Sequence, residues 1–172
     1  MLIQIQDLKR KNYLDTLQIQ EGLRNQVLKN DKENYLVLVE HDHVYTLGKN
    51  ANSNNVLNSS CETIQTQRGG DVTYHGPGQL VAYPIINLKK NKIGVKTYVE
   101  MIEKLISNIL FDYGLKPHVP IKETGVWIED RKIASIGIHV SRGITMHGLA
   151  INVNTDLSYF DNIISCGIEG VK

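Results

Sequence analysis

The chain has 172 residues, of which 41% are hydrophobic and 22% are charged, and its formal net charge is +1. This length suits one domain that buries its own core without disulfides or metals. The balanced charge gives no nucleic-acid signature, and no stretch approaches the roughly 18 apolar residues of a membrane span. The N-terminal segment lacks the basic-then-apolar order of a signal peptide. We therefore expect a cytoplasmic protein that binds neither nucleic acid nor membrane.

The first half of the chain predicts one helix and two strands. Residues 13–29 carry leucines and a valine at helical spacing among polar partners, which is a moderate amphipathic pattern. Residues 35–40 form a short apolar run typical of a buried strand, and the Asn- and Ser-rich residues 49–60 predict a surface loop. Residues 81–88 favour a further strand, in which Pro84 indicates an edge position or a bulge.

The clearest helix is predicted at residues 98–113, where apolar side chains keep helical spacing. Thr97 and Glu100 have the spacing of a capping box at its start. Gly114 supplies the stop at its C-terminal end.

After this helix the chain predicts strands at residues 125–129, 132–140 and 145–153, with turn residues between them. Strands gathered around a few helices, without regular alternation, favour a single-domain α+β fold over a doubly wound sheet.

The segment RGGDVTYHGPGQL, residues 68–80, is the most informative stretch. Four of its residues are glycines, and glycine costs conformational entropy wherever its freedom is not used. Such density indicates a backbone that contacts a ligand, with N–H groups lining a cleft. Asp71 and Thr73 are interpreted as fixing this loop, and ordinary turn chemistry is the alternative.

Two residues far apart in the sequence are candidates for catalysis. Cys166 lies between two small residues and is either a small buried hydrophobe or a nucleophile, which would need a nearby cation to ionise at neutral pH. Lys132 begins an apolar run and is either that cation or a solvated lysine at the edge of a hairpin. The second cysteine, Cys61, does not make a disulfide framework with Cys166. The residues alone leave these alternatives open.

The six histidines do not predict a metal site, because no Cys or His cluster has metal-ligand spacing. His75 and His147 are better interpreted as groups that line a pocket.

Four segments, in order, carry a resemblance to a known family. RGGDVTYHGPGQL (68–80), RKIASIGIHV (131–140), HGLAINVNTDLS (147–158) and SCGI (165–168) resemble the motifs of the lipoyl(octanoyl) transferases. The resemblance implies the fold of biotin and lipoate ligases, a mixed and largely antiparallel sheet with packed helices. Family members usually continue for several dozen residues beyond the cysteine motif. We therefore expect residues 1–172 to be one catalytic domain that lacks this segment.

The resemblance also implies a role for individual residues. Cys166 matches the nucleophile that forms an acyl thioester, and Lys132 matches the lysine that lowers its pKa and shuttles the proton. The implied substrate pocket comprises Arg68, Gly69, Gly70, Asp71, Val72, Thr73, Tyr74, His75, Ser135, Ile136, Gly137, Gly148, Leu149 and Ala150.

The implied reaction moves an octanoyl or lipoyl group from acyl carrier protein to a specific lysine of a lipoyl domain, as in 2-oxoacid dehydrogenases or the glycine cleavage H protein. It needs no cofactor. Backbone N–H groups near Gly76, Gly78 or Gly167 are candidates for stabilising the oxyanion. The basic run Lys89-Lys90-Asn91-Lys92 is either a solvated turn or a docking surface for the acidic carrier protein.

Two alternatives remain open from the sequence. One is a lipoate-protein ligase of the same fold, which would activate free lipoate with ATP. The other is a catalytically inactive module that binds acyl chains or carrier proteins.

Overall fold

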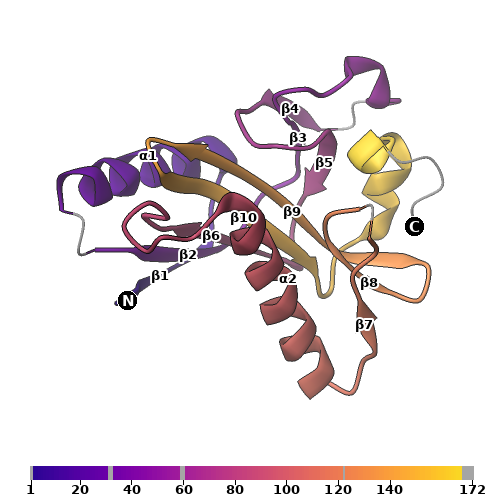
Figure 1. The fold of residues 1–172 in the computed structure, drawn as a ribbon. Coiled ribbons are helices and arrows are strands. Elements are labelled where there is room, and N and C mark those ends of the chain that lie inside the picture. The colour runs from indigo at the N-terminus through magenta and orange to yellow at the C-terminus, as the bar shows by residue number, and fades with distance from the viewer. Residues whose placement is uncertain (1, 31–32, 59–60, 122, 168–172) are drawn as a thin grey trace.

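Strands dominate the structure, a computed structural model that describes residues 2–30, 33–58, 61–121 and 123–167, with only the backbone of Cys166. The larger sheet has seven strands in the order β1-β2-β6-β10-β9-β8-β7 (Figure 1). Its strands are β1 (Gln4–Arg10), β2 (Tyr35–Glu40), β6 (Gln79–Ile85), β10 (Ile144–Asn152), β9 (Arg131–Ser141), β8 (Val126–Ile128) and β7 (Pro117–His118). Within it, β1 and β2 are parallel and the other neighbours are antiparallel.

A second sheet has three short strands, β4 (Glu62–Gln65), β3 (Val44–Leu47) and β5 (Val72–His75), in the order β4-β3-β5. The sequence did not predict it, because each strand has only four residues and β5 lies inside the glycine-rich motif. Three short 3₁₀ turns complete the fold, η1 (Ser53–Asn55), η2 (Leu157–Asn162) and η3 (Ser165–Gly167). The mixed, largely antiparallel α+β architecture agrees with the expected fold class.

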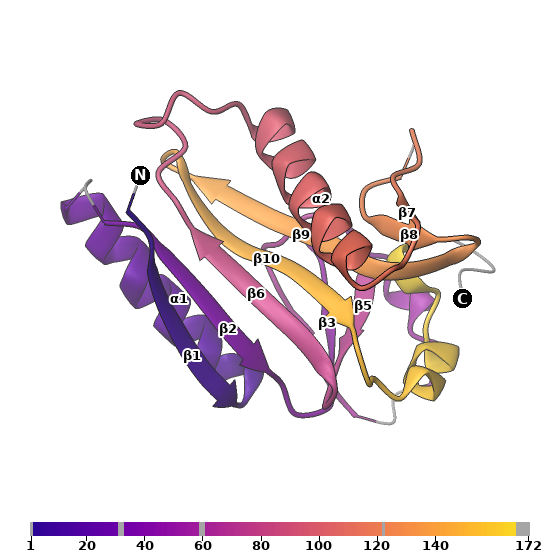
Figure 2. The ribbon, with the colours of Figure 1, turned by 90° about the horizontal axis from the view of Figure 1, so that it is seen from below.

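Two helices, α1 (Tyr13–Lys29) and α2 (Val95–Asp112), cover opposite faces of the large sheet (Figure 2). Successive side chains of a strand point to opposite faces, and β10 shows the consequence. Leu149 and Ile151 pack in the cluster that contains α2, whereas Ala150 packs in the cluster that contains α1. The sheet is therefore buried on both sides where β10 and β6 cross its centre.

The start of α1 agrees with the sequence prediction, and Asn12 caps it by accepting a hydrogen bond from the backbone N–H of Leu14 at 2.8 Å. The predicted start of α2 was wrong. The helix begins at Val95 with Gly94 as its N-cap, and no side chain caps it. Tyr98 is buried in the core and its N–H donates to the Gly94 carbonyl, so packing extends the helix beyond the predicted capping box.

Pro84 does not lie on an edge strand, because β6 pairs with both β2 and β10. The regular pairing of β6 with β10 covers Gln79–Ala82 and does not include Pro84, which has no N–H to donate. The Thr145 side chain bridges this break: its hydroxyl donates to the Pro84 carbonyl at 2.6 Å and accepts from the Ile86 N–H at 2.9 Å. A proline is thus accommodated in a central strand by one threonine.

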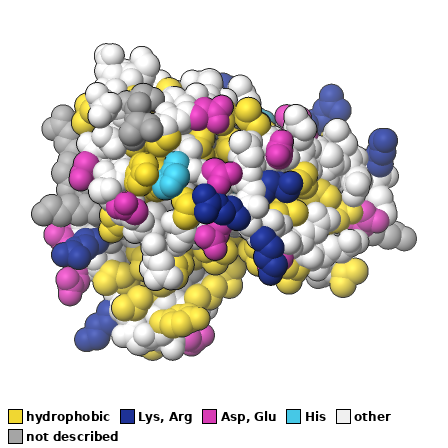
Figure 3. All heavy atoms as spheres, turned by 180° about the vertical axis from the view of Figure 1, so that it is seen from behind, with side chains coloured by type: hydrophobic (Ala, Val, Ile, Leu, Met, Phe, Trp, Pro, Cys, Tyr) yellow, Lys and Arg dark blue, Asp and Glu magenta, His cyan; other side chains and the backbone are white. Residues whose placement is uncertain are grey.

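The surface is mixed in charge, and hydrophobic side chains gather on the lower lobe seen from behind in Figure 3. Met101, Leu105 and Ile109 are exposed on α2 at four-residue spacing, so this helix carries apolar side chains on its outer face as well as its inner one. None of the described helices is long and apolar enough to cross a membrane.

Candidate active site

A narrow pocket of about 50 Å³ lies where the loop before β5 crosses β9 and β10. The Gly69 N–H donates to the Ile138 carbonyl at 2.9 Å, which ties this loop to β9. We call it the glycine-loop pocket. It is lined by Tyr13, Arg68, Gly69, Gly70, Asp71, Thr73, His75, Val81, Tyr83, Ser135, Ile136, Gly137, His147, Gly148, Leu149 and Ala150.

Of the fourteen residues expected in the substrate pocket, all but Val72 and Tyr74 line this cavity. These two point to the other face of β5, where both are fully buried in a cluster with Tyr45. The alternation of side chains along a strand explains the difference, since Thr73 and His75 point into the pocket. Three further lining residues, Tyr13, Val81 and Tyr83, were missed because nothing in α1 or β6 distinguishes them from ordinary core residues.

Gly148 is required at its position by a close approach of two strands. A Cβ atom there would lie 2.1 Å from the carbonyl oxygen of Ala82 on β6. Only a residue without a side chain lets the backbone of β10 form this wall of the pocket.

Arg68 is buried and holds the glycine loop in place. Its guanidinium group donates to the Thr46 hydroxyl at 3.0 Å through Nη2 and to the Thr46 carbonyl at 2.5 Å. Its positive charge also helps to lower the pKa of His75 and of His147.

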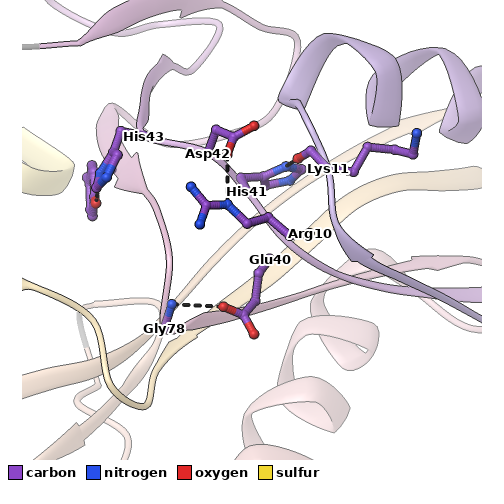
Figure 4. Close-up of polar contacts among 8 residues, drawn as sticks. Arg10, Lys11, Glu40, His41, Asp42, His43 and Gly78 are labelled. Carbon is purple, nitrogen blue, oxygen red and sulfur yellow. Dashed lines mark hydrogen bonds and ion pairs between the residues drawn. The ribbon is translucent and has the colours of Figure 1, made fainter.

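Two buried histidines, His75 and His147, line the pocket, and the ring of a third, His41, lies 5.8 Å from that of His75. Burial lowers the pKa of His41 to about 4, that of His75 to about 3 and that of His147 to about 4. Nδ1 of His41 is 2.9 Å from the Lys11 carbonyl oxygen (Figure 4). Its Nε2 is 2.8 Å from the Tyr83 hydroxyl oxygen. All three imidazoles are therefore neutral at pH 7. Among the described residues, no group of three or more His, Cys, Asp or Glu side chains is arranged to hold a metal ion.

A second and larger cavity, of about 490 Å³, lies beside the β8–β9 hairpin. We call it the hairpin cavity. It is lined by Leu115, Ile128, Arg131, Lys132, Ile133, Ser135, Asn152, Leu157, Phe160, Asp161 and Ser165. Ser135 lines both cavities, so the glycine-loop pocket and the hairpin cavity are neighbours on either side of this residue.

Lys132 lies in the wall of the hairpin cavity and is half-buried, unlike a lysine that extends into water. Its Nζ is 5.8 Å from the centre of the Trp127 ring, within range of a cation–π interaction. The aliphatic stem occupies the space beside Gly125, where a Cβ atom would lie 2.6 Å from Cε of Lys132. The Gly125 N–H donates to the buried Glu103 carboxylate of α2, which fixes the backbone against which the lysine packs.

The cysteine motif forms η3, and the side chain of Cys166 lies outside the described part of the structure. The backbone of this turn is nevertheless well anchored. The Ile164 N–H donates to the Asn55 carbonyl at 2.8 Å, and the Asn55 side chain donates to the Asp71 carboxylate at 2.6 Å. A Cβ atom at Gly167 would lie 2.8 Å from the same carboxylate.

The cysteine turn is thus flanked by both cavities. Asp71, which contacts Gly167, lines the glycine-loop pocket, and Ser165 lines the hairpin cavity together with Lys132. The structure therefore brings the three distant segments that carry Lys132, Asp71 and Cys166 to one place.

Two of the glycines expected to bind an oxyanion already use their N–H groups. The Gly78 N–H donates to the Glu40 carboxylate at 2.9 Å (Figure 4), and the Gly167 N–H donates to the Ile164 carbonyl at 3.1 Å. Either would have to give up this bond to stabilise an oxyanion.

The basic run at Lys89–Lys92 lies beside the turn between β9 and β10, away from Lys132. The N–H of Leu88 donates to the carbonyl of Gly143 in the β9–β10 turn, whereas Lys132 lies at the opposite end of β9. Ser141 lies nine residue steps beyond Lys132 along β9, or about 30 Å at 3.3 Å per residue.

Comparison with known proteins identifies the family. Residues 12–172 match the lipoyl protein ligase A/B catalytic domain. The octanoyltransferase of Solibacter usitatus is 46% identical over 171 residues, which cover 95% of this chain and 78% of that protein. The octanoyltransferase of Christiangramia forsetii is 41% identical, with 98% of this chain and 82% of that protein covered.

The chain belongs to the lipoyl protein ligase A/B family. Solved structures agree on the fold of this family. A lipoate-protein ligase A bound with ATP superposes with a TM-score of 0.77 at 17% identity and covers 96% of this chain and 72% of its own. A biotin protein ligase from Aquifex aeolicus has a TM-score of 0.51 at 13% identity, covering 90% of this chain and 52% of its own. The expected relation to biotin and lipoate ligases is confirmed at the level of the fold.

Proposed function

We propose that the protein transfers an octanoyl group from acyl carrier protein to a lysine of a lipoyl domain through a thioester on Cys166. The observation that carries this proposal is the presence of two neighbouring cavities beside the cysteine turn, with Lys132 in the wall of one of them. The relatives named octanoyltransferase, at 41% and 46% identity, support the same reaction.

In the first half-reaction, the Cys166 thiolate attacks the carbonyl carbon of the donor thioester. A new S–C bond forms, the bond to the donor sulfur breaks, and the donor thiol leaves with a proton from Lys132. One thioester replaces another, so this step is nearly isoenergetic and needs no ATP.

In the second half-reaction, the amine of the acceptor lysine attacks the acyl-cysteine. An amide forms, the Cys166 thiolate leaves, and Lys132 in its neutral form takes the proton from the amine. A single lysine can serve both steps because each step returns it to the protonation state that the other step needs.

The glycine-loop pocket is the proposed site of the acyl chain. Ile136 and Leu149 supply apolar walls, and Gly137 and Gly148 keep the backbone close to the chain. The two histidines that line this pocket, His75 and His147, are neutral, so an uncharged acyl chain meets no ionised imidazole.

The proposed acceptors are lipoyl domains of 2-oxoacid dehydrogenases or the glycine cleavage H protein. We place the reaction in the cytoplasm, because a reducing compartment keeps the nucleophilic thiol from oxidation. The proposed chemistry uses neither a cofactor nor a metal ion.

The decisive assay follows octanoylation of a lipoyl domain by mass spectrometry. We expect transfer from octanoyl-acyl carrier protein without ATP, and no transfer from free octanoate even with ATP and Mg²⁺. The reverse pattern would identify a ligase. Absence of transfer from both donors would leave the inactive binding module as the function.

A further inference from the structure

We propose that the hairpin cavity binds the phosphopantetheine arm of the acyl donor, with Arg131 at its rim contacting the phosphate. This inference rests on the proposed function and adds a binding site to it. In a donor whose thioester lies at the cysteine turn, the acyl chain and the thiol portion extend in different directions from the thioester group. The acyl chain is assigned to the glycine-loop pocket, which leaves the neighbouring hairpin cavity, with Ser135 shared between the two linings, for the thiol portion of the donor.

The hairpin cavity is large enough to hold a long, flexible group such as the phosphopantetheine arm. Its volume of about 490 Å³ falls within the roughly 300–1,000 Å³ typical of sites for small molecules. The narrow glycine-loop pocket, about 50 Å³, does not leave room for both portions of the donor.

The chemistry of the walls also fits such an arm, which alternates short alkyl segments with amides and ends in a phosphate. Leu115, Ile128 and Phe160 supply apolar surface, while Ser135 and Asn152 supply polar groups among them. The side-chain oxygen Oδ1 of Asn152 accepts a hydrogen bond from Nε2 of Gln79 at 2.9 Å. This bond orients the amide so that its Nδ2 is the donor left for an amide carbonyl of the arm.

The positive charge of Arg131 indicates where the phosphate of the arm would bind. Arg131 is exposed at the start of β9, next to Lys132, and both line the cavity. A guanidinium group recognises phosphate through two parallel hydrogen bonds. Asp161 is the acidic residue among those that line the cavity. The attraction of Arg131 for the phosphate must exceed the repulsion from the Asp161 carboxylate.

The test compares donors that differ in one group. Octanoyl-phosphopantetheine and octanoyl-pantetheine carry the same thioester, and only the first has a phosphate. The measurement is the rate of octanoyl adduct formation on Cys166 in a single turnover, read by intact mass spectrometry without an acceptor. In the wild type we expect the phosphate-bearing donor to react about fivefold faster, as for a partly solvated ion pair.

Arg131→Gln should bring this ratio close to one. The matched control is Arg142→Gln, because Arg142 is an exposed arginine in the turn at the opposite end of β9, and it should keep the wild-type ratio. A ratio that is unchanged in Arg131→Gln, or that is lost equally in Arg142→Gln, would overturn the assignment of the phosphate contact.

A second variant tests the cavity itself. Leu157 is exposed at the start of η2 and lines the cavity, so Leu157→Trp narrows the cavity without disturbing a buried core. We expect it to slow both pantetheine donors at least tenfold more than it slows octanoyl S-ethyl thioester, which has no arm. Equal slowing of all three donors would overturn the proposed site. Absence of a Cys166 adduct with every donor in the wild type would instead refute the proposed function.

Discussion

Acid should unfold this protein well before its carboxylates are protonated, because three histidines are buried in neutral form. His41, His75 and His147 are each at most 6% exposed. Burial lowers their pKa values from the ordinary 6.5 to about 4, 3 and 4. The unfolded chain therefore binds more protons than the folded protein between pH 6.5 and about pH 4. Stability is complete above pH 6.5 and falls as the pH drops through this range.

The magnitude follows from the size of this window. Each pH unit below 6.5 costs about 1.4 kcal/mol of free energy of unfolding per histidine that stays neutral in the folded state. At pH 5 the three histidines together remove about 6 kcal/mol, which is comparable to the whole stability of many domains, about 5–15 kcal/mol. For a chain of this length the melting temperature should fall by about 12–24 °C between pH 7.5 and pH 5.

Thermal melts followed by circular dichroism at half-unit steps from pH 7.5 to pH 5 measure this effect. His41→Gln should reduce the pH dependence by about a third, because one of the three buried imidazoles is gone. His118→Gln is the matched control, since His118 is exposed on β7, and it should leave the dependence as in the wild type. A melting temperature that stays within a few degrees across this pH range would refute the reasoning.

Three further changes test the site. Lys132→Arg should lose most transfer activity, because guanidinium cannot release a proton; single-turnover aminolysis at the normal rate would restrict Lys132 to an electrostatic role. Gly148→Ala should destabilise the protein by about 1–3 kcal/mol through overpacking and abolish acylation, and an unchanged urea midpoint would contradict the close approach to Ala82. Shortening the donor acyl chain from eight to six carbons should slow acylation about 15-fold, since each buried methylene contributes about 0.8 kcal/mol; equal rates would show that the chain stays in solvent.

Local patterns predicted the elements whose signals lie within one segment. The bounds of α1 and β2 follow from apolar spacing and from a short apolar run. The start of α2 depended on the burial of Tyr98 in the core. The position of Pro84 in a central strand depended on its hydrogen bond with Thr145 of β10. Such contacts override local capping and strand rules.

The sequence motifs predicted part of the candidate site, but not the residues that tertiary packing brings to it. The glycine-rich segment and the two triplets on β9 and β10 were named from the sequence, and the structure brings them together. Tyr13 and Tyr83 could not be found in this way, because they come from α1 and β6 and reach the pocket only through tertiary packing. The anchoring of the cysteine turn by Asn55 was equally hidden, since the sequence shows this asparagine only as part of a polar loop.

The central claim is a thioester on Cys166, and the adduct itself tests it most directly. The protein is mixed with octanoyl-acyl carrier protein, quenched in acid, and mapped by intact and peptide mass spectrometry. We predict one octanoyl group on Cys166, its persistence in Cys61→Ala and its absence in Cys166→Ala. An octanoyl group on Cys61, or transfer to a lipoyl domain that continues in Cys166→Ala, would contradict the account.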